Sequence, residues 1–303
     1  MADKKTVNAR NTRRRPAVST QPPGKPKLGQ HFLRDAGAAR RIVEALGDIG
    51  RATVIEIGPG PGALTALLAA RAPRLIAVEI DRVLAAQLRM KYARNANVEV
   101  IEGDILSVEL GNLIRRKPGP LLAGPALTRE EAAQKAQVIG NLPYYITSDI
   151  LLHLLEQHEL LETIVIMVQR EVAERIAAEP GTRDYGLLSA TVQLFCRVEK
   201  LFTLPPGAFS PPPEVHSSVL RLRVAPQMDS LGVEPEEFIS FLKVGFAQKR
   251  KTLANNLKQH YDKERISAGL RAARIRPETR AEAIPLDKMA VLFKTMVGAA
   301  PTS

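Results

Sequence analysis

Short apolar runs that alternate with longer helix-forming segments constrain the fold of this chain more than any other feature. The runs are rich in β-branched residues, and segments long enough for a helix, such as 63–70 and 83–93, separate them. Strands joined in this way predict a parallel sheet with right-handed crossovers. The five runs are Thr53–Ile57, Leu75–Ile80, Val98–Ile101, Val138–Ile139 and Ile164–Val168.

The pattern changes after the fifth run. Phe195–Leu204 and Val215–Val224 are longer alternating runs joined by Pro205–Pro213, which predicts an antiparallel hairpin closing one edge of the sheet. From about Met228 only helical segments remain, so we expect a small all-helical domain after the α/β domain. The helices expected there are Pro235–Ala247, Lys249–His260, Lys263–Ala272 and Leu286–Val297.

The chain is strongly basic, with 43 Lys and Arg residues against 32 Asp and Glu residues and a net charge of +11. This excess favours a polyanionic partner, with nucleic acid ahead of an acidic membrane because lipid-inserting aromatic segments are missing. No window approaches the roughly 18 apolar residues of a membrane helix, which excludes a membrane-spanning helix. Residues 1–27 are basic and hold one acidic residue, Asp3, so we expect a disordered basic tail. A transit peptide, a solubility tail and a phosphate-binding arm all remain open for it.

A single cysteine, Cys196, excludes a disulfide framework, and the five histidines show no metal-ligand spacing. We therefore expect no metal and a reducing, cytoplasmic compartment. The segment 115–137 separates the third and fourth runs, and its residues include Pro118, Pro120, Gly124 and Pro125. Its first part is expected to be an exposed loop of unknown purpose, and the capping box Thr128-Arg129-Glu130-Glu131 predicts a helix in its last part.

A glycine-rich motif, Glu56-Ile57-Gly58-Pro59-Gly60-Pro61-Gly62, begins within the end of the first run and continues as a loop. Gly58 and Gly60 would let the backbone approach a nucleotide at the carboxyl edge of the sheet. Glu79 ends the next strand and suits a ribose diol, while Asp104 ends the third and could accept from an adenine amine. The loop also satisfies the dinucleotide fingerprint G-x-G-x-x-A, so by itself it leaves a nicotinamide cofactor or a purely structural turn open.

The most specific motif is Asn141-Leu142-Pro143-Tyr144, directly after the fourth run. An amine on a nucleobase is a poor nucleophile because its lone pair is delocalised into the ring. The Asn141 side-chain carbonyl and the Leu142 backbone carbonyl, held extended by Pro143, could accept its two N–H groups and favour a tetrahedral nitrogen. Tyr144 would supply a face on which the base stacks, worth about 1–3 kcal/mol.

These motifs together resemble the class I S-adenosylmethionine-dependent methyltransferases acting on adenine N6. More narrowly, the chain resembles the ribosomal RNA adenine dimethyltransferases of the KsgA/RsmA family from about Leu28 to Val297. Further segments follow in the family's order, namely Leu28–Leu33, Val78–Asp81, Gly103–Leu106, Val168–Arg175, Phe209–Val215 and Phe246–Leu253.

The resemblance implies a Rossmann-like methyltransferase domain at 28–227 and a helical RNA-binding domain at 228–303. It implies S-adenosyl-L-methionine as the cofactor, with contacts from His31, Leu33, Gly58, Gly60, Glu79, Asp104 and Asn141. Position 31 is commonly Asn in this signature, so the contact there is expected from a ring nitrogen or a backbone group. The resemblance also places Phe209 on the target adenine, opposite Tyr144.

The implied substrate is small-subunit ribosomal RNA in a pre-subunit particle, with N6,N6-dimethyladenosine formed at two adjacent adenines of a 3′-terminal hairpin loop. We expect a monomer with a role in small-subunit biogenesis. Lys249, Arg250 and Lys251 are candidates for phosphate contacts, and a solvated basic helix is the alternative. Other functions stay open: a DNA adenine methyltransferase, a macrolide-resistance methyltransferase of large-subunit RNA, a mitochondrial transcription-assisting relative, and an assembly factor in which catalysis is secondary.

Overall fold

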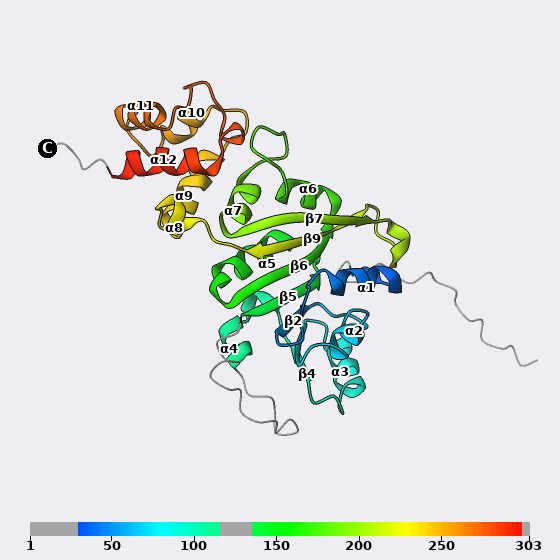
Figure 1. Ribbon diagram of the computed structural model, residues 1–303. Coiled ribbons are helices and arrows are strands. Elements are labelled where there is room, and N and C mark those ends of the chain that lie inside the picture. Colours follow the sequence, from blue (N-terminus) through cyan, green and yellow to red (C-terminus); the bar gives the residue numbers. More distant parts are fainter. Residues whose placement is uncertain (1–29, 116–134, 299–303) are drawn as a thin grey trace, which may run out of the picture. The chain divides into compact units, whose positions relative to one another are not determined.

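The computed structural model of the protein describes residues 30–115 and 135–298 (Figure 1). Its main sheet has seven strands in the order β4-β3-β2-β5-β6-β9-β7. The strands are β2 (Thr53–Ile57), β3 (Arg74–Glu79), β4 (Val98–Glu102), β5 (Ala136–Asn141), β6 (Leu161–Gln169), β7 (Cys196–Leu204) and β9 (Ser217–Val224).

Strands β4, β3, β2, β5 and β6 pair in parallel, whereas β9 pairs antiparallel with both β6 and β7. The predicted parallel sheet with an antiparallel hairpin at one edge is therefore confirmed. The strand order reverses between β2 and β5, because the chain winds outward to β4 and then returns to the other side of β2. In open α/β sheets, ligands bind at such a switch point, outside the carboxyl ends of the strands.

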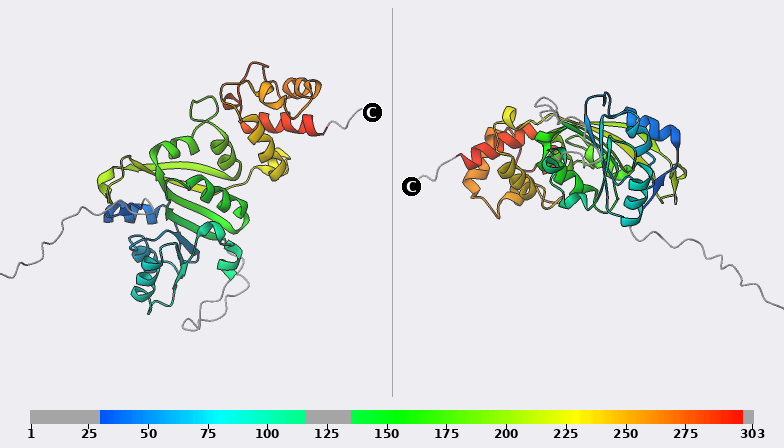
Figure 2. Two further views of the ribbon diagram at one scale, coloured as in Figure 1. Left: turned by 180° about the vertical axis from the view of Figure 1, so that it is seen from behind. Right: turned by 90° about the horizontal axis from the view of Figure 1, so that it is seen from below.

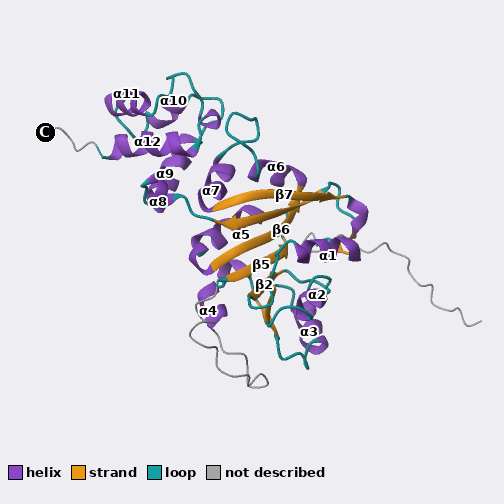
Figure 3. Cartoon of the chain, in the orientation of Figure 1, coloured by secondary structure: helices purple, strands orange, loops and turns teal. Residues whose placement is uncertain are grey.

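Helices cover both faces of this sheet (Figures 2 and 3). Side chains alternate along each strand, so Ile55 and Ile57 join one apolar cluster and Val54 joins the other. Helices on the Val54 side are α1 (Ala36–Glu44), α2 (Thr65–Ala69) and α3 (Arg82–Lys91). Those on the Ile55 side are α4 (Leu110–Arg115), α5 (Thr147–Glu156), α6 (Arg170–Ile176) and α7 (Leu187–Phe195).

A second, two-stranded sheet joins parts of the chain far apart in sequence. Strand β1 (Phe32–Leu33) pairs antiparallel with β8 (Phe209–Ser210), with Phe32 opposite Ser210 and Leu33 opposite Phe209. Two residues are too few for any periodicity, so the sequence pattern did not predict these strands. The pairing brings the 28–33 and 209–215 motifs together.

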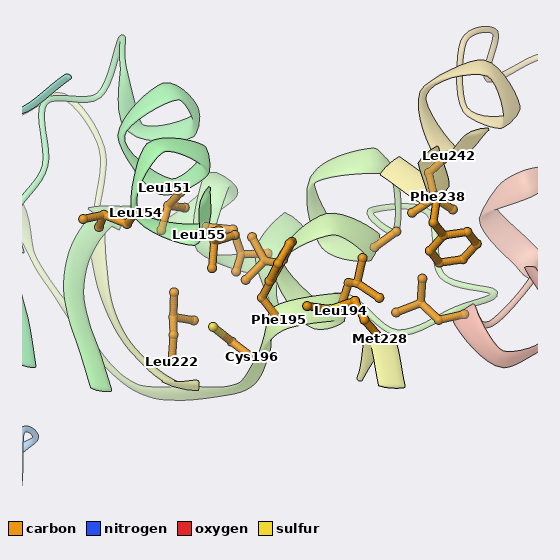
Figure 4. Packing of buried hydrophobic residues seen from close by; sticks show 14 of the residues in the cluster. Leu151, Leu154, Leu155, Leu194, Phe195, Cys196, Leu222, Met228, Phe238 and Leu242 are labelled. Atoms are coloured by element: carbon orange, nitrogen blue, oxygen red, sulfur yellow. The ribbon is translucent and has the colours of Figure 1, made fainter. Parts of the chain in front are cut away.

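The C-terminal region contains the helices α8 (Met228–Leu231), α9 (Pro235–Gly245), α10 (Leu253–Leu257), α11 (Lys263–Ala272) and α12 (Leu286–Val297). Its apolar side chains continue the cluster on the Ile55 side of the sheet, and Phe238 and Leu242 lie beyond Leu194 and Met228 in Figure 4. The proposed domain boundary at residue 228 stays a prediction.

The helix predicted over 249–260 is shorter than expected. Helix α10 begins only at Leu253, because the Thr252 hydroxyl accepts from Asn255 N and caps it there. Lys249–Lys251 therefore lie in an exposed turn, and the alternative of a basic helix at these residues is wrong.

The basic tail 1–27 and the capping box at Thr128–Glu131 lie outside the described residues. Within residues 30–115 and 135–298, no helix is long and apolar enough to cross a bilayer. The same residues contain no group of three or more His, Cys, Asp or Glu side chains that could hold a metal ion.

Candidate active site

The glycine loop and the Asn141 motif meet at the switch point, since β2 and β5 are parallel neighbours that end side by side. Ile57 pairs with Gly140, which puts Gly58 next to Asn141. A Cβ at position 140 would lie 2.7 Å from the Ile57 carbonyl oxygen. Glycine at 140 is therefore a requirement of the close strand approach that joins the two motifs.

The loop after β2 is held by its own hydrogen bonds. Gly60 has φ of +56°, and a Cβ there would lie 2.8 Å from the Phe32 ring. Its N–H donates to Glu79 Oε2 at 2.9 Å, and Asp81 N donates to Glu79 Oε1 at 2.9 Å. Phe32 and Glu79 thus fix the path of the loop from two sides.

The two acidic residues expected to bind the nucleoside, Glu79 and Asp104, both accept hydrogen bonds from backbone N–H groups. Glu79 is 2% exposed, and both of its carboxylate oxygens accept the N–H bonds just described. Asp104 is half-buried, and its Oδ1 accepts from Leu106 N at 3.0 Å at the start of a 3-10 helix, Ile105–Ser107. Each oxygen has a second lone pair, so contacts to a ribose or an adenine amine are compatible with these bonds and stay predictions.

Asn141 is oriented by a residue 110 positions earlier in the chain. Its Nδ2 donates to the His31 carbonyl oxygen at 2.8 Å. With the nitrogen engaged, the side-chain oxygen is the end of the amide left to accept from a ligand. The sequence predicted the acceptor at Asn141 but gave no signal for the group that orients it.

His31 also orders the aromatic side of the site. Its ring stacks on that of Tyr144, with centroids 5.8 Å apart and planes 26° apart, and its Nδ1 lies 2.8 Å from the Pro211 carbonyl oxygen. The Tyr144 hydroxyl lies 2.8 Å from Ser217 Oγ. Burial raises the pKa of this hydroxyl, and the hydrogen bond with Ser217 opposes the shift. Tyr144 is therefore a neutral, anchored ring.

The backbone after Asn141 leaves a second acceptor. Leu142 N donates to the Met167 carbonyl at 3.0 Å, and the Pro143 carbonyl accepts from Ile146 N at 3.3 Å and from Thr147 Oγ1 at 3.0 Å. Within the described chain, no hydrogen bond is made to the Leu142 carbonyl oxygen. This arrangement is compatible with the predicted pair of acceptors at 141 and 142.

Phe209 lies deeper than its expected role requires. It pairs with Leu33 in the small sheet, joins the apolar cluster on the Val54 side, and is 3% exposed. The adenine is expected between the rings of Tyr144 and Phe209. The Tyr144 ring is half-buried, whereas the Phe209 ring is buried. Stacking of Phe209 on adenine stays a prediction that needs this ring to be uncovered.

One buried side chain at this edge was not among the predicted site residues. Glu56 is 1% exposed, and its Oε2 has no hydrogen-bond partner within the described part of the chain. Desolvation by burial raises the pKa of its carboxyl from 4.5 to about 8, with the polar groups of Thr65 opposing the shift and repulsion from Glu79 adding to it. Glu56 lines a small cavity together with Leu33, Gly58 and Asn141. The sequence did offer a signal for Glu56, because it is a carboxyl residue within the otherwise uncharged strand Thr53–Ile57.

The third group of predicted residues lies in the C-terminal region. Lys249, Arg250 and Lys251 are exposed in the turn between α9 and α10, and they line a surface depression with Gln248. Lys249 Nζ lies 3.5 Å from the Arg183 carbonyl oxygen. Their role in RNA binding stays a prediction.

Comparison with known proteins agrees with this geometry. The model of the ribosomal RNA adenine dimethylase family matches residues 23–297. The chain is 58% identical over 278 residues to the ribosomal RNA small subunit methyltransferase A of Koribacter versatilis, covering 92% of this chain and 96% of that protein. It is 54% identical to the protein of the same name from Acidobacterium capsulatum, covering 90% and 91%.

Two solved structures share the architecture. The 23S rRNA methyltransferase ErmE is 28% identical with a TM-score of 0.63, covering 88% of this chain and 99% of that one. A dimethyladenosine transferase from Plasmodium falciparum is 26% identical with a TM-score of 0.69, covering 86% and 96%. The Rossmann-like methyltransferase fold expected from the sequence is therefore confirmed, and the chain belongs to the ribosomal RNA adenine dimethylase family.

Proposed function

We propose that this protein transfers methyl groups from S-adenosyl-L-methionine to N6 of adenines in small-subunit ribosomal RNA. The observation that carries the proposal is the Asn141 amide, whose nitrogen is bound to the His31 carbonyl so that its oxygen is left as an acceptor at the switch point. Family membership supports ribosomal RNA adenine as the substrate. The small-subunit names of the two relatives above support this subunit over the large one.

The residues at the switch point fit a cationic nucleoside cofactor. Glu56 Oε2 is a buried acceptor without a partner in the described chain, and Gly58 is exposed, with 3.8 Å from an added Cβ to the Asn141 carbonyl oxygen. S-adenosyl-L-methionine would supply a methyl group on an electron-poor sulfonium. The residues proposed to hold it are those predicted from the sequence: His31, Leu33, Gly58, Gly60, Glu79, Asp104 and Asn141.

The chain's part in the reaction is to make the adenine amine nucleophilic and to position it. Asn141 Oδ1 and the Leu142 carbonyl oxygen accept the two N6–H groups, which favours a tetrahedral nitrogen as its new bond forms. Tyr144 supplies the stacking face, and its hydroxyl stays with Ser217. No side chain need act as a general base, because the product amine is cationic and loses a proton to water. Most of the rate enhancement then comes from orientation.

RNA engagement involves an exposed loop rather than a groove. The target base must leave its stack, at a cost of a few kcal/mol that is smaller in a hairpin loop. The finer parts of this proposal concern the target and the setting. The targets are two adjacent adenines of a 3′-terminal hairpin loop in a pre-subunit particle, and the protein acts as a monomer in the cytoplasm. Lys249, Arg250 and Lys251 would neutralise phosphates beside that loop.

The test is methyl transfer from tritiated S-adenosyl-L-methionine to undermethylated small subunits, followed by nucleoside analysis. Labelled N6,N6-dimethyladenosine in small-subunit RNA is the expected product. Large subunits serve as the competing substrate, and the Asn141→Ala variant serves as the control for contaminating activity. Label confined to large-subunit RNA, or to a nucleoside other than adenosine, would refute the proposal.

A further inference from the structure

Glu56 occupies a position that strand geometry assigns to an apolar side chain. Side chains alternate along β2, so Glu56 faces the same side as Val54. On that side of the sheet, Ile139 of the neighbouring strand β5 and Met167 of the next strand, β6, belong to the apolar cluster. A carboxyl placed there and 1% exposed loses nearly all of its hydration, which favours its neutral form.

Few groups around Glu56 compensate for the lost water. Thr65, at the start of α2, partly opposes the rise of the Glu56 pKa, yet neither Thr65 Oγ1 nor Glu56 Oε2 has a hydrogen-bond partner in the described chain. From β3, Glu79 adds repulsion. From β5 and β1 the cavity is lined by Asn141, Leu33 and Phe32, which carry no charge. Nothing cationic among these cavity-lining residues balances an ionised Glu56.

The cavity beside Glu56 lies between the two halves of the site. The nucleoside end of the cofactor is assigned to Glu79 and Asp104, at the ends of β3 and β4. The amino-acid end is then left for the space between β2 and β5, where Glu56, Gly58 and Asn141 line one cavity. That end carries an ammonium group and a carboxylate. Of the two, only the ammonium donates hydrogen bonds and is positively charged, so it is the group suited to Glu56.

We propose that Glu56 is the counter-ion for this ammonium group, and that cofactor binding is coupled to the loss of the Glu56 carboxyl proton. The proposal rests on the proposed function. In the free protein the O–H bond of Glu56 is intact. When the cofactor binds, that bond breaks, the proton passes to the buffer, and the carboxylate pairs with the ammonium, which keeps its own protons. One proton is thus released for each cofactor bound.

The linkage has a defined direction. Because burial raises the pKa of the free carboxyl to about 8 and the adjacent cation would lower this pKa in the complex, proton release should be nearly complete at neutral pH. The association constant of the cofactor then rises with pH, by up to about tenfold per pH unit, until the free carboxyl itself ionises. Without the linkage, Glu56 would contribute no pH dependence over this range.

Isothermal titration calorimetry in two buffers of different ionisation enthalpy counts these protons directly. Three ligands separate the cationic groups: S-adenosylmethionine has ammonium and sulfonium, S-adenosylhomocysteine has the ammonium alone, and 5′-methylthioadenosine lacks the amino-acid end. At neutral pH we expect close to one proton released with the first two ligands and none with the third. The Glu56→Gln variant, checked for folding by thermal denaturation, should bind without releasing a proton.

Equal proton counts for wild type and Glu56→Gln would overturn the inference, as would release with 5′-methylthioadenosine. Release with S-adenosylmethionine alone would overturn the assignment to the ammonium. If Glu56→Gln does not fold, the three ligands on the wild-type protein still decide. Cofactor binding without proton release refutes only this inference, whereas no binding of S-adenosylmethionine at all refutes the proposed function as well.

Discussion

At the end of β3, Glu79 is buried and both of its carboxylate oxygens accept backbone N–H groups. At the end of β5, Asn141 is half-buried, and of its side-chain amide only the nitrogen is hydrogen-bonded within the described residues. The carboxylate at the end of β3 is thus engaged by the backbone around it, whereas the side-chain oxygen of Asn141 at the end of β5 is left to accept a hydrogen bond from a ligand. We infer that the first holds a cofactor in a fixed loop and the second admits a base from a flexible RNA.

Substitutions on the β5 side should change catalysis with little effect on cofactor binding. Asn141→Ala should lower kcat by at least about 100-fold, since it removes one of the two acceptors for the N6–H groups. Its Kd for S-adenosylmethionine should stay within about tenfold of wild type. Asn112→Ala, an exposed position on α4, is the control. Near-normal methylation by Asn141→Ala would remove the distinction between the two sides.

Substitutions in the glycine loop after β2, which Glu79 of β3 holds in place, should have the opposite profile. Gly60→Ala forces a β-carbon into the left-handed region, costing about 1–2 kcal/mol, and against the Phe32 ring. We expect a lower free energy of unfolding in urea and weaker cofactor binding. Gly103→Ala, where an added Cβ meets no atom within 4 Å, should leave the unfolding free energy nearly unchanged. Equal effects of both variants would mean that the loop is not fixed as described.

The buried carboxyl between the two sides should appear in the pH dependence of stability. The folded-state pKa of Glu56 is raised to about 8, so wild type loses stability as pH rises from the unfolded pKa of 4.5 towards 8. Glu56→Gln has no such loss. The free energy of unfolding of Glu56→Gln in urea, relative to that of wild type, should therefore rise by up to about 1.4 kcal/mol per pH unit between pH 4.5 and 8. Glu156→Gln, at an exposed site on α5, should not gain stability with pH in this way.

The basic turn should affect RNA binding without touching either side of the switch point. Replacing Lys249, Arg250 and Lys251 by Ala should flatten the salt dependence of RNA affinity, by about 0.7–0.9 in the log–log slope for each phosphate that is no longer neutralised. Cofactor affinity should not change. The exposed triplet Lys263→Ala, Arg271→Ala and Lys288→Ala, which removes the same three charges elsewhere in the C-terminal region, controls for net charge. An unchanged slope in the triple variant would exclude this turn from the RNA interface.

The smallest effect is expected at the Tyr144 hydroxyl. Tyr144→Phe keeps the ring and removes the hydrogen bond with Ser217, so the cost should be about 1 kcal/mol, visible as a small rise in KM for RNA. Tyr144→Ala also removes the stacking face and should cost about 1–3 kcal/mol more. If the two variants are equally impaired, the hydroxyl rather than the ring is the functional part of Tyr144.

Local patterns predicted the sheet well because strand alternation and buried β-branched runs depend on near neighbours. They also indicated that residues 141–144 belong to the candidate site, since these four residues are consecutive in the sequence. They did not predict the β1–β8 pairing, the His31 carbonyl that orients Asn141, or Ser217 beside Tyr144, because each joins segments distant in sequence. The helix expected at Lys249 failed because the cap at Thr252 starts α10 later.

The proposed chemistry depends on two oxygens of the β5 side holding the amine of an adenine. A crystal structure with S-adenosylhomocysteine and a short RNA containing the target adenines would show whether they do. We expect Asn141 Oδ1 and the Leu142 carbonyl oxygen each about 3 Å from adenine N6, with the base on Tyr144. An Asn141 amide turned so that its nitrogen faces the base, or an adenine bound away from Tyr144, would contradict this chemistry.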